Sequence, residues 1–531
     1  MLDKISLPVS RRHLHGLAMA AGVLGAIWVL TSWIVVGTPT ELVMLGLGLL
    51  GGAILLNILN DWRSGFYLSL VWLLFEDLAR KYLSNNMYIY FGKDVLIGMT
   101  YLSFFLALRR RQAETFRPPF LFPLSLFFWL AVGQMFNPGS PSLLYGLLGL
   151  KLYFYYVPLM FVGYALIRSE RDLHRLLVVN LVMASVIALL GVVQAIEGPT
   201  FLNPQVLAPE LTTLGRLTRV APISGSLVTI PTSVFVSGGR FGWYMVLTWL
   251  LGLGSVGYFL LHTRRGRKTA FVSIAVMAAG ILVSGSRSAV VWALCNTIVM
   301  AAGFLWSAPW KWGQANRLLK AIRRTLLLAG LGVAVVVWYF PTAVGPRWDF
   351  YSETLSPVSP SSELAWRSWG YPVQNFLLAF ENPLWPYGYG TGTSSLGVQY
   401  VRRLLGEPPG KMGVESGFGA LVVEMGILGP SLWLVWSGSL LLTTWRVVRR
   451  LKGTAYLPVA LCIFWFAFLV LLPFMCIGMQ PYQNFVMNAY LWLLVGILFR
   501  LPTLGTQFPH HVSVAEHHLA GQHAIAFTGG K

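Results

Sequence analysis

Long apolar runs are the feature that most constrains the fold of this chain. Runs of about 16 to 25 residues, the length that crosses a bilayer as a helix, begin near residues 16, 41, 64, 94, 120, 142, 173, 240, 269, 287, 325, 417, 455 and 484. The run near residue 64 is the weakest, because Glu76, Asp77, Arg80 and Lys81 crowd its second half. With 56% hydrophobic and 11% charged residues, the chain is too apolar for a soluble protein of 531 residues. The sequence therefore predicts an all-α polytopic membrane protein with about 12 to 14 transmembrane helices.

Basic residues gather in short segments between these runs. If the N-terminus is cytoplasmic, the most basic segments all fall on the cytoplasmic side, as the positive-inside rule requires. They are residues 108–117, 167–175, 262–269, 311–324 and 445–452. We therefore expect both termini in the cytoplasm. The net charge of +20 belongs to these segments and does not indicate a nucleic-acid partner.

The same topology places the two longest connections, residues 197–239 and 341–416, on the outer side. Within the second, residues 361–383 carry aromatic and aliphatic side chains at helical spacing. This pattern predicts an amphipathic helix on the membrane surface that stops at Asn382-Pro383. We expect residues 1–500 to form one polytopic domain and residues 501–531 to form a disordered, polar, cytoplasmic tail.

A tight outer turn, "SGSRSA" (284–289), carries the first candidate site residue, Arg287. Gly285 can turn the chain and expose backbone N–H groups beside the guanidinium, an arrangement that suits a phosphate. The alternative is that Arg287 only anchors a helix end at the interface.

Other outer arginines favour an anionic ligand. Arg240 lies at the mouth of an apolar run, and Arg367 lies in the predicted surface helix. Arg216 and Arg219, in the first long connection, would line the vestibule. Such a surface attracts an anionic head group.

Lys151 is a candidate because of its depth, about 15 Å below the outer end of its helix. Ionisable residues at that depth are functional candidates, although an ion pair with Glu76 or Asp77 is the structural alternative. For Arg402 and Arg403, contact with anionic lipid is the simpler interpretation.

Two glutamates lie in "GVESGFGALVVEMGILGP" (413–430). Glu415 stands where the second long connection returns to the membrane. Desolvation there would raise the pKa of its carboxylate, which would suit a general base. The alternative is capping of the following helix by a residue of its first turn. Glu424 is expected to make a polar contact to a neighbouring helix.

All nine histidines fall in cytoplasmic segments of this topology. The outer face therefore has no histidine to act as a base or to bind a metal. We expect the protein to use no metal and no cofactor.

Three features in a fixed order carry a family resemblance: the turn with Arg287, a long connection containing Arg367 and "ENPLWPYGYGTG" (381–392), and "ESGFGALVVEMGILG" (415–429). Over residues 240–440 the chain resembles the O-antigen ligase and O-antigen polymerase superfamily of bacterial membrane glycosyltransferases. The resemblance implies a bacterial inner-membrane enzyme whose outer loop closes over a cavity for an undecaprenyl diphosphate-linked glycan.

The resemblance also implies site roles. A metal-independent, inverting transfer to an acceptor sugar hydroxyl is expected, with Arg287 and Arg367 matching arginines of the family and holding the diphosphate. Glu415 falls where ligases commonly carry histidine, so the chain is more similar to the exopolysaccharide polymerase branch. The implied partners are the lipid-linked donor, the glycan acceptor, membrane lipids, and export or chain-length proteins.

Three alternatives stay open. The first is an O-antigen ligase that transfers glycan to a lipid or protein acceptor. The second is a lipid-linked oligosaccharide flippase or another transporter, against which the unrelated halves and long outer connections count. The third is a non-catalytic subunit of a polysaccharide export complex.

Overall fold

The computed structural model describes most of the chain between residues 51 and 505. The segments outside the description are residues 1–50, 213, 263–265, 308–319, 321–322, 324–337, 340, 357–365, 367–369, 395–396, 409–413, 478–479 and 506–531. Among the described residues, 51–69 and 95–103 form a small unit, joined internally by the hydrogen bond between Ser69 and Thr100. The candidate site described below lies in the larger unit.

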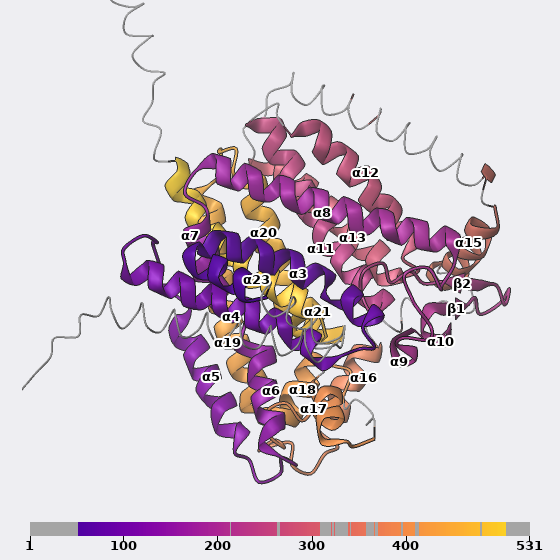
Figure 1. The fold of residues 1–531 in the computed structure, drawn as a ribbon, viewed down its shortest axis with the longest axis horizontal. Coiled ribbons are helices and arrows are strands. Elements are labelled where there is room, and N and C mark those ends of the chain that lie inside the picture. Colours follow the sequence, from indigo (N-terminus) through magenta and orange to yellow (C-terminus); the bar gives the residue numbers. More distant parts are fainter. Residues whose placement is uncertain are drawn as a thin grey trace, which may run out of the picture. The chain divides into compact units, whose positions relative to one another are not determined.

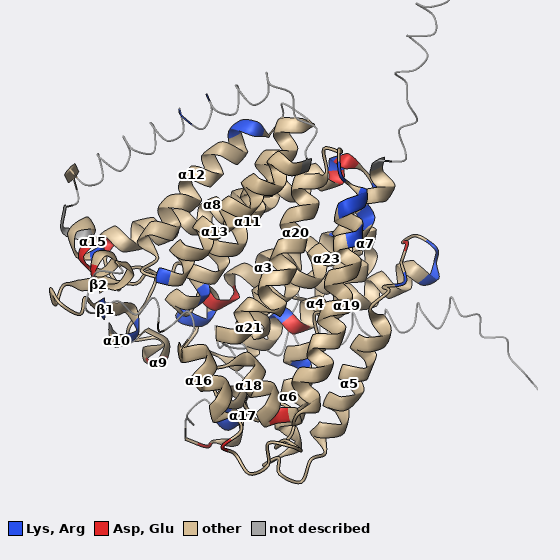
Figure 2. Cartoon of the chain, turned by 180° about the vertical axis from the view of Figure 1, so that it is seen from behind, with Lys and Arg blue, Asp and Glu red and all other residues tan. Residues whose placement is uncertain are grey.

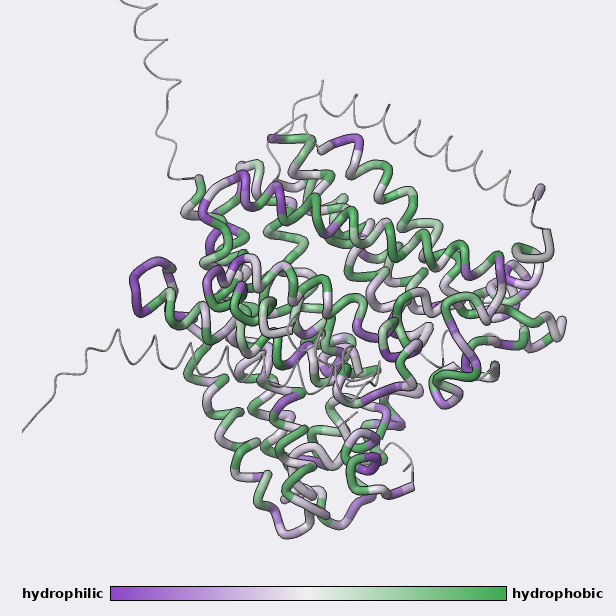
Figure 3. Tube along the Cα trace, in the orientation of Figure 1, coloured by the Kyte–Doolittle hydropathy of each residue, from purple (hydrophilic) through white to green (hydrophobic). Residues whose placement is uncertain are grey.

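Seven helical segments in the described part of the chain are long and apolar enough to cross a membrane. They are α4 (Met87–Arg109), α6 with α7 (Leu143–Phe154 and Leu159–Leu166), α8 (Glu170–Glu197), α11 (Gly238–Leu261), α13 (Arg287–Ser307), α20 with α21 (Leu457–Leu471 and Pro473–Ile477) and α23 (Phe485–Gly505). Figures 1 and 3 show these helices and the hydrophobic residues along most of their length. The prediction of an all-α polytopic membrane protein is confirmed at this level.

The other predicted runs differ from simple spans. The runs near 16 and 325 lie outside the described residues, and the run near 41 is described only from residue 51, where Gly51–Asn60 is a short apolar helix. The run near 64 is the charged helix α3 (Trp62–Tyr82), and those near 120 and 269 form the shorter helices α5 (Leu121–Met135) and α12 (Arg267–Val283).

The run beginning near residue 417 is not one helix. It forms α18 (Gly417–Met425) and α19 (Leu428–Arg450), because Gly426 has a φ of +65° and ends the first helix. A side chain there would meet the Pro386 carbonyl oxygen at 2.2 Å. Glycine is therefore required both by the backbone conformation and by the close approach.

Close contacts between glycines and backbone bring α7 and α23 together. A Cβ atom at Gly496 would lie 1.9 Å from the Met160 carbonyl oxygen, and one at Gly163 would lie 2.2 Å from that of Leu493. Small residues of this kind let membrane helices approach closely. In the same unit α8 packs against α12, and α11 packs against α12, α13 and α20.

The two long connections contain regular structure. The first has α9 (Pro209–Thr212), α10 (Leu214–Leu217) and a hairpin of β1 (Thr218–Val220) with β2 (Leu227–Thr229). The second has α15 (Pro341–Leu355), α16 (Tyr371–Leu378) and α17 (Gly397–Leu405). Glu353 and Asp349 of α15 bond to the hairpin, so the two connections lie on the same side of the helices.

Two predicted boundaries differ from the structure. In the region of the predicted surface helix, α16 ends at Leu378, and turns with i→i+3 hydrogen bonds then continue through Glu381, next to the predicted stop at Asn382-Pro383. The tail prediction began too early, since α23 continues to Gly505 with Leu501 and Leu504 buried. Figure 2 shows basic and acidic residues at helix ends and also among the helices.

Candidate functional site

Four charged residues of α3 are almost fully buried. Glu76, Asp77, Arg80 and Lys81 each expose 2% or less of their surface. Burying charges is costly unless they are paired, and in the sequence these residues only weakened the prediction of a span. Their partners come from other helices and from both long connections.

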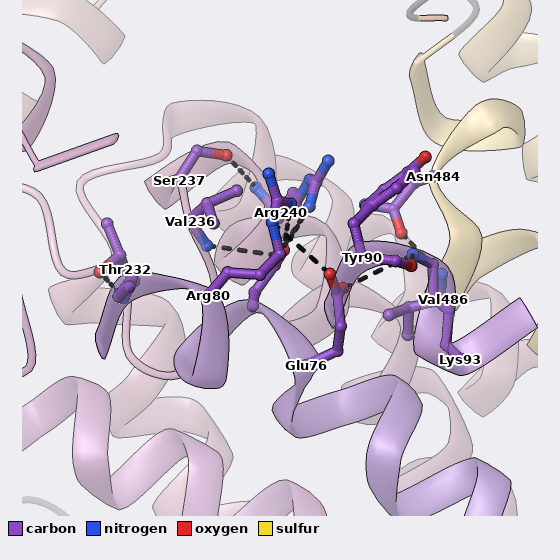
Figure 4. A network of polar contacts seen from close by, with 12 residues as sticks. Glu76, Arg80, Tyr90, Lys93, Thr232, Val236, Ser237, Arg240, Asn484 and Val486 are labelled. Atoms are coloured by element: carbon purple, nitrogen blue, oxygen red, sulfur yellow. Dashed lines mark hydrogen bonds and ion pairs between the residues drawn. The ribbon is translucent and has the colours of Figure 1, made fainter. Parts of the chain in front are cut away.

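Asp77 accepts hydrogen bonds from three directions, and Figure 4 shows the residues that donate them, Arg240, Arg80 and Val236. Nη1 of Arg240 donates to both carboxylate oxygens, at 2.9 and 2.6 Å. Nη1 of Arg80 donates at 3.2 Å, and the Val236 amide donates at 3.3 Å. Arg240 stands in the first turn of α11, which Ser237 caps by accepting from the Arg240 amide. Asp77 therefore ties α3 to the start of α11.

The neighbouring carboxylate, Glu76, is held more loosely. Its oxygens lie 3.6 Å from Nε of Arg80 and 3.8 Å from Nζ of Lys93. Among the described residues it has no hydrogen-bond partner. Two adjacent buried acids thus differ sharply in how they are held.

Tyr90 of α4 lies at the centre of the basic residues. Nζ of Lys93 is 3.4 Å from the ring centroid, Nζ of Lys151 is 4.6 Å away, and the Arg80 guanidinium is 5.1 Å away. The Tyr400 ring of α17 stacks on Tyr90 at 4.4 Å, with 18° between the planes. Cation–π contacts of this kind stabilise desolvated cations.

Lys151 forms an ion pair, but not with either of the acids that the structural alternative named. Its Nζ lies 2.5 Å from a carboxylate oxygen of Asp94 on α4, not beside Glu76 or Asp77. The sequence could not distinguish these acids, because the choice depends on how α4 and α6 pack.

We call this set of residues the charge cluster. It contains the bases Arg80, Lys81, Lys93, Lys151 and Arg240, the acids Glu76, Asp77 and Asp94, and the stacked pair Tyr90 and Tyr400. Five basic residues face three acidic ones, so the cluster has a formal surplus of positive charge. Arg240 also donates from Nη2 to the Tyr400 hydroxyl, at 3.4 Å, so α17 lies over the cluster.

The first long connection is also bonded to the cluster. Nζ of Lys81 donates to the Thr232 hydroxyl and to the Ser233 carbonyl oxygen, each at 2.9 Å. Asn85 accepts from Arg80 and donates to Glu210 at 2.8 Å. The cluster therefore links α3 with the first connection.

Arg287 is the first residue of α13 and lies at intermediate exposure. Its guanidinium is 5.6 Å from the Phe350 ring of α15. The preceding residue, Ser286, packs so closely on α11 that a Cβ atom at Gly242 would lie 3.1 Å from the serine Cβ. The helix starts that carry Arg240 and Arg287 are therefore in contact with each other.

Glu415 is exposed and accepts a hydrogen bond from the Tyr371 hydroxyl of α16. The helix cap is made by the next residue, because Ser416 accepts from the Gly419 amide at 3.2 Å. The capping alternative therefore describes Ser416 and not Glu415. Arg367 lies outside the described residues.

The remaining predicted basic residues lie at the surface. Arg216 is exposed and donates to the Glu210 carbonyl oxygen at 2.8 Å, and Arg219 is exposed on β1. Arg402 and Arg403, interpreted from the sequence as lipid contacts, lie 3.9 Å from Glu407 and 3.6 Å from Glu210 respectively.

Glu424 makes the predicted contact to a neighbouring helix. It is fully buried, and its carboxylate accepts from the Tyr153 hydroxyl of α6 at 2.9 Å. The Ser394 amide donates to the other oxygen at 3.1 Å. The acid thus fixes part of the second connection against α6.

Sequence reasoning missed Lys93, Asp94 and Tyr400. The signal for the first two was a Lys-Asp pair inside an apolar run, which is rare without a partner. Tyr400 gave no signal, because its role depends on where α17 lies. Among the described residues, no group of three or more His, Cys, Asp or Glu side chains could hold a metal ion.

Comparison of the chain with family models, with curated proteins and with solved structures found no match.

Proposed function

We propose that this chain is a glycosyltransferase of a bacterial inner membrane that joins undecaprenyl diphosphate-linked glycan units into a polysaccharide. The observation that carries the proposal is the contact between the starts of α11 and α13, each of which bears an arginine, Arg240 and Arg287. Two helix N-termini with two guanidinium groups favour a polyanion such as a diphosphate. The charge cluster adds further positive charge beside Arg240.

In this proposal the arginines stabilise the diphosphate as it leaves. Asp77 holds Nη1 of Arg240, while Nη2 points to Tyr400 and would be the group that meets the ligand. Lys151, paired with Asp94, contributes positive charge near the diphosphate but does not contact it directly. Arg367, with Arg216 and Arg219, completes the basic lining of the donor path.

Glu415 is the proposed base. It accepts the proton of the attacking sugar hydroxyl, and the Tyr371 hydroxyl holds its carboxylate in place. The exposed position of Glu415 suits a group that must meet an acceptor arriving from solvent. An O-antigen ligase would use the same groups with a different acceptor.

A transporter of lipid-linked oligosaccharide is the second candidate. The buried charge cluster favours it, because ionisable groups among membrane helices commonly line ion or substrate paths. Polymer formation distinguishes the two functions, since a flippase moves its substrate without changing its length.

The test uses the purified protein in lipid nanodiscs with undecaprenyl diphosphate-linked repeat units. The expected products are longer glycans and free undecaprenyl diphosphate. Glu415→Gln should abolish both products, whereas Glu381→Gln, an exposed acid of the same connection, should leave them unchanged. Arg287→Lys, which keeps the charge but loses the two-pronged donor, should slow release of the diphosphate.

Absence of polymer with the unsubstituted protein would contradict the proposal. Normal product length with Glu415→Gln would remove Glu415 from the mechanism while leaving the glycosyltransferase proposal intact. Transfer of a single glycan block to an added lipid acceptor, without polymer growth, would identify a ligase.

A further inference from the structure

The connection between α4 and α5 carries four exposed arginines and one acid. The acid is Glu114, and the arginines are Arg109, Arg110, Arg111 and Arg117. Glu114 already has a partner, because Nη1 of Arg500 in α23 donates to its carboxylate at 2.6 Å. Among the described residues, no acid forms an ion pair with any of the four arginines. The connection therefore has a local surplus of positive charge that the protein itself does not balance.

A fifth arginine belongs to the same surface. Arg168, at the exposed turn before α8, donates from Nη2 to the Gln112 carbonyl oxygen at 3.0 Å. The two acids of this turn are already bonded elsewhere. Asp172 accepts from the Arg168 amide at 3.0 Å, and Glu170 lies 2.8 Å from Nε2 of His262. The basic connection is thus fastened to the start of α8 as well as to α23.

Apolar side chains on both sides set the level of these arginines. Arg109 is the last residue of α4, which is long and apolar enough to cross a bilayer. Its guanidinium lies 4.7 Å from the Phe105 ring, one turn earlier, and that ring is 49% exposed. Beyond the connection α5 begins with Leu121 and Phe122, which are 46% and 73% exposed. Basic side chains at the ends of apolar helices place their charges at the head-group level.

This combination favours one kind of partner. Arginine binds phosphate oxygens through two parallel N–H groups, and basic clusters directly beside a membrane-crossing helix are typical of sites for anionic lipids. An acidic soluble protein would balance the charge but would leave the exposed Phe105 and Phe122 without an apolar partner. We propose that the α4–α5 connection binds an anionic phospholipid, with its phosphate held by Arg109, Arg110 and Arg111 and an acyl chain along Phe105.

A bound lipid would act on more than the connection. Because Arg500 and Arg168 join the connection to α23 and to the start of α8, the lipid would help to fix this end of three helices. The proposed site shares no residue with the charge cluster, Arg287 or Glu415. It does not depend on glycosyl transfer, so its failure and the failure of the proposed function are separate outcomes.

The test measures which lipid lies next to the connection in the full-length protein. The native cysteines Cys295, Cys462 and Cys476 are first replaced, and a fluorescent bimane group is attached at Thr115→Cys, an exposed position of the connection. The protein is placed in phosphatidylcholine nanodiscs that contain an equal small fraction of nitroxide-labelled phosphatidylglycerol or nitroxide-labelled phosphatidylcholine. Because a nitroxide quenches bimane only at short range, the ratio of the two quenching efficiencies reports the lipid preference at this position.

Phosphatidylglycerol should quench the label more strongly, with a preference of about fivefold, the gain that one arginine contributes at an anionic surface. Replacing Arg110 and Arg111 together by Gln should remove most of this preference. Both side chains are exposed, so the variant should fold normally. Replacing Arg449 and Arg450 by Gln, an equal loss of charge at the exposed end of α19, should preserve the preference.

Three results would overturn the proposal. Equal quenching by the two lipids would rule out selection of the anionic head group. An equal fall in preference in both double variants would show a response to total charge and not to this connection. Absence of quenching by either lipid would place the connection away from the head groups, in water or against a protein partner.

Discussion

Asp77 and Glu424 are both buried acids, exposing 1% and 0% of their surface, but they are held in opposite ways. The partners of Asp77 include two guanidinium groups, from Arg240 and Arg80, together with one backbone amide. Glu424 instead accepts from neutral groups, a tyrosine hydroxyl and a backbone amide. One acid balances buried cations, whereas the other only fixes a loop. This difference separates a region of buried ion pairs from a region held by neutral hydrogen-bond donors.

The largest expected loss of stability comes from removing Asp77, the acid that balances buried cations. Asp77→Ala leaves Arg240 and Arg80 buried without their main counter-charge, which costs about 3 to 5 kcal/mol. We expect a large loss in the free energy of unfolding, measured by denaturant titration in mixed micelles. Glu76→Gln is the matched control, because Glu76 has only ion pairs at 3.6 and 3.8 Å, and it should cost much less. Equal costs for both variants would contradict the central role of Asp77.

Removing the acid with neutral partners should have an intermediate effect. Glu424→Leu leaves the Tyr153 hydroxyl and the Ser394 amide buried without an acceptor, at a cost of about 1 to 3 kcal/mol. The same denaturant titration measures it. Tyr153→Phe removes one of these donors, so combining it with Glu424→Leu should cost less than the sum of the two single variants. A loss as large as that of Asp77→Ala would remove the distinction between the two regions.

The contrast between these acids also shows the limits of the sequence. Apolar run length predicted most of the helices, because each run must satisfy its own backbone inside a membrane. It could not predict the break at Gly426, which depends on a positive φ and on the nearby Pro386 carbonyl oxygen. Glu424 was assigned a structural contact correctly, since a lone acid in a short apolar stretch needs one partner.

The candidate site was less predictable. Arg240 and Lys151 were selected because cations near membrane spans are costly and therefore informative. Their partners Asp77 and Asp94 depend on helix packing. The catalytic roles of Arg287 and Glu415 belong to the proposed function.

A smaller loss of stability is expected from substitution of Tyr400, where α17 of the second connection covers the charge cluster. Tyr400→Phe keeps the stack on Tyr90 but loses the 3.4 Å hydrogen bond from Arg240, a change of about 0.5 to 1.5 kcal/mol. Hydrogen exchange of α17 amides should rise modestly. Tyr400→Ala also removes the stack and should raise exchange further. Unchanged exchange in Tyr400→Ala would show that α17 is held only by its packing on α6.

The smallest effect on stability should come from Glu353. Like Glu424, Glu353 accepts hydrogen bonds from neutral donors, but it lies at the surface. Desolvation acts to raise the pKa of Glu353, but hydrogen bonds from Ile223 and Ser224 outweigh it, and the pKa lies below the ordinary value of 4.5. Because the folded-state pKa is lowered, the stabilising contribution is complete above about pH 4.5 and is lost as the pH falls through the folded-state pKa.

This pH dependence tests whether hydrogen bonds from neutral donors alone can fix the hairpin to a solvent-exposed carboxylate. A spin label at Leu227 in detergent should become more mobile as the pH falls below the ordinary glutamate value. Glu353→Gln, which cannot lose a charge, should give a label mobility that does not change over the same pH range. If both proteins show the same pH response, the hairpin is held by the packing of Val228 on Phe350 and the Glu353 hydrogen bonds contribute little. In that outcome, only the buried acids of this comparison, Asp77 and Glu424, would stabilise the structure measurably.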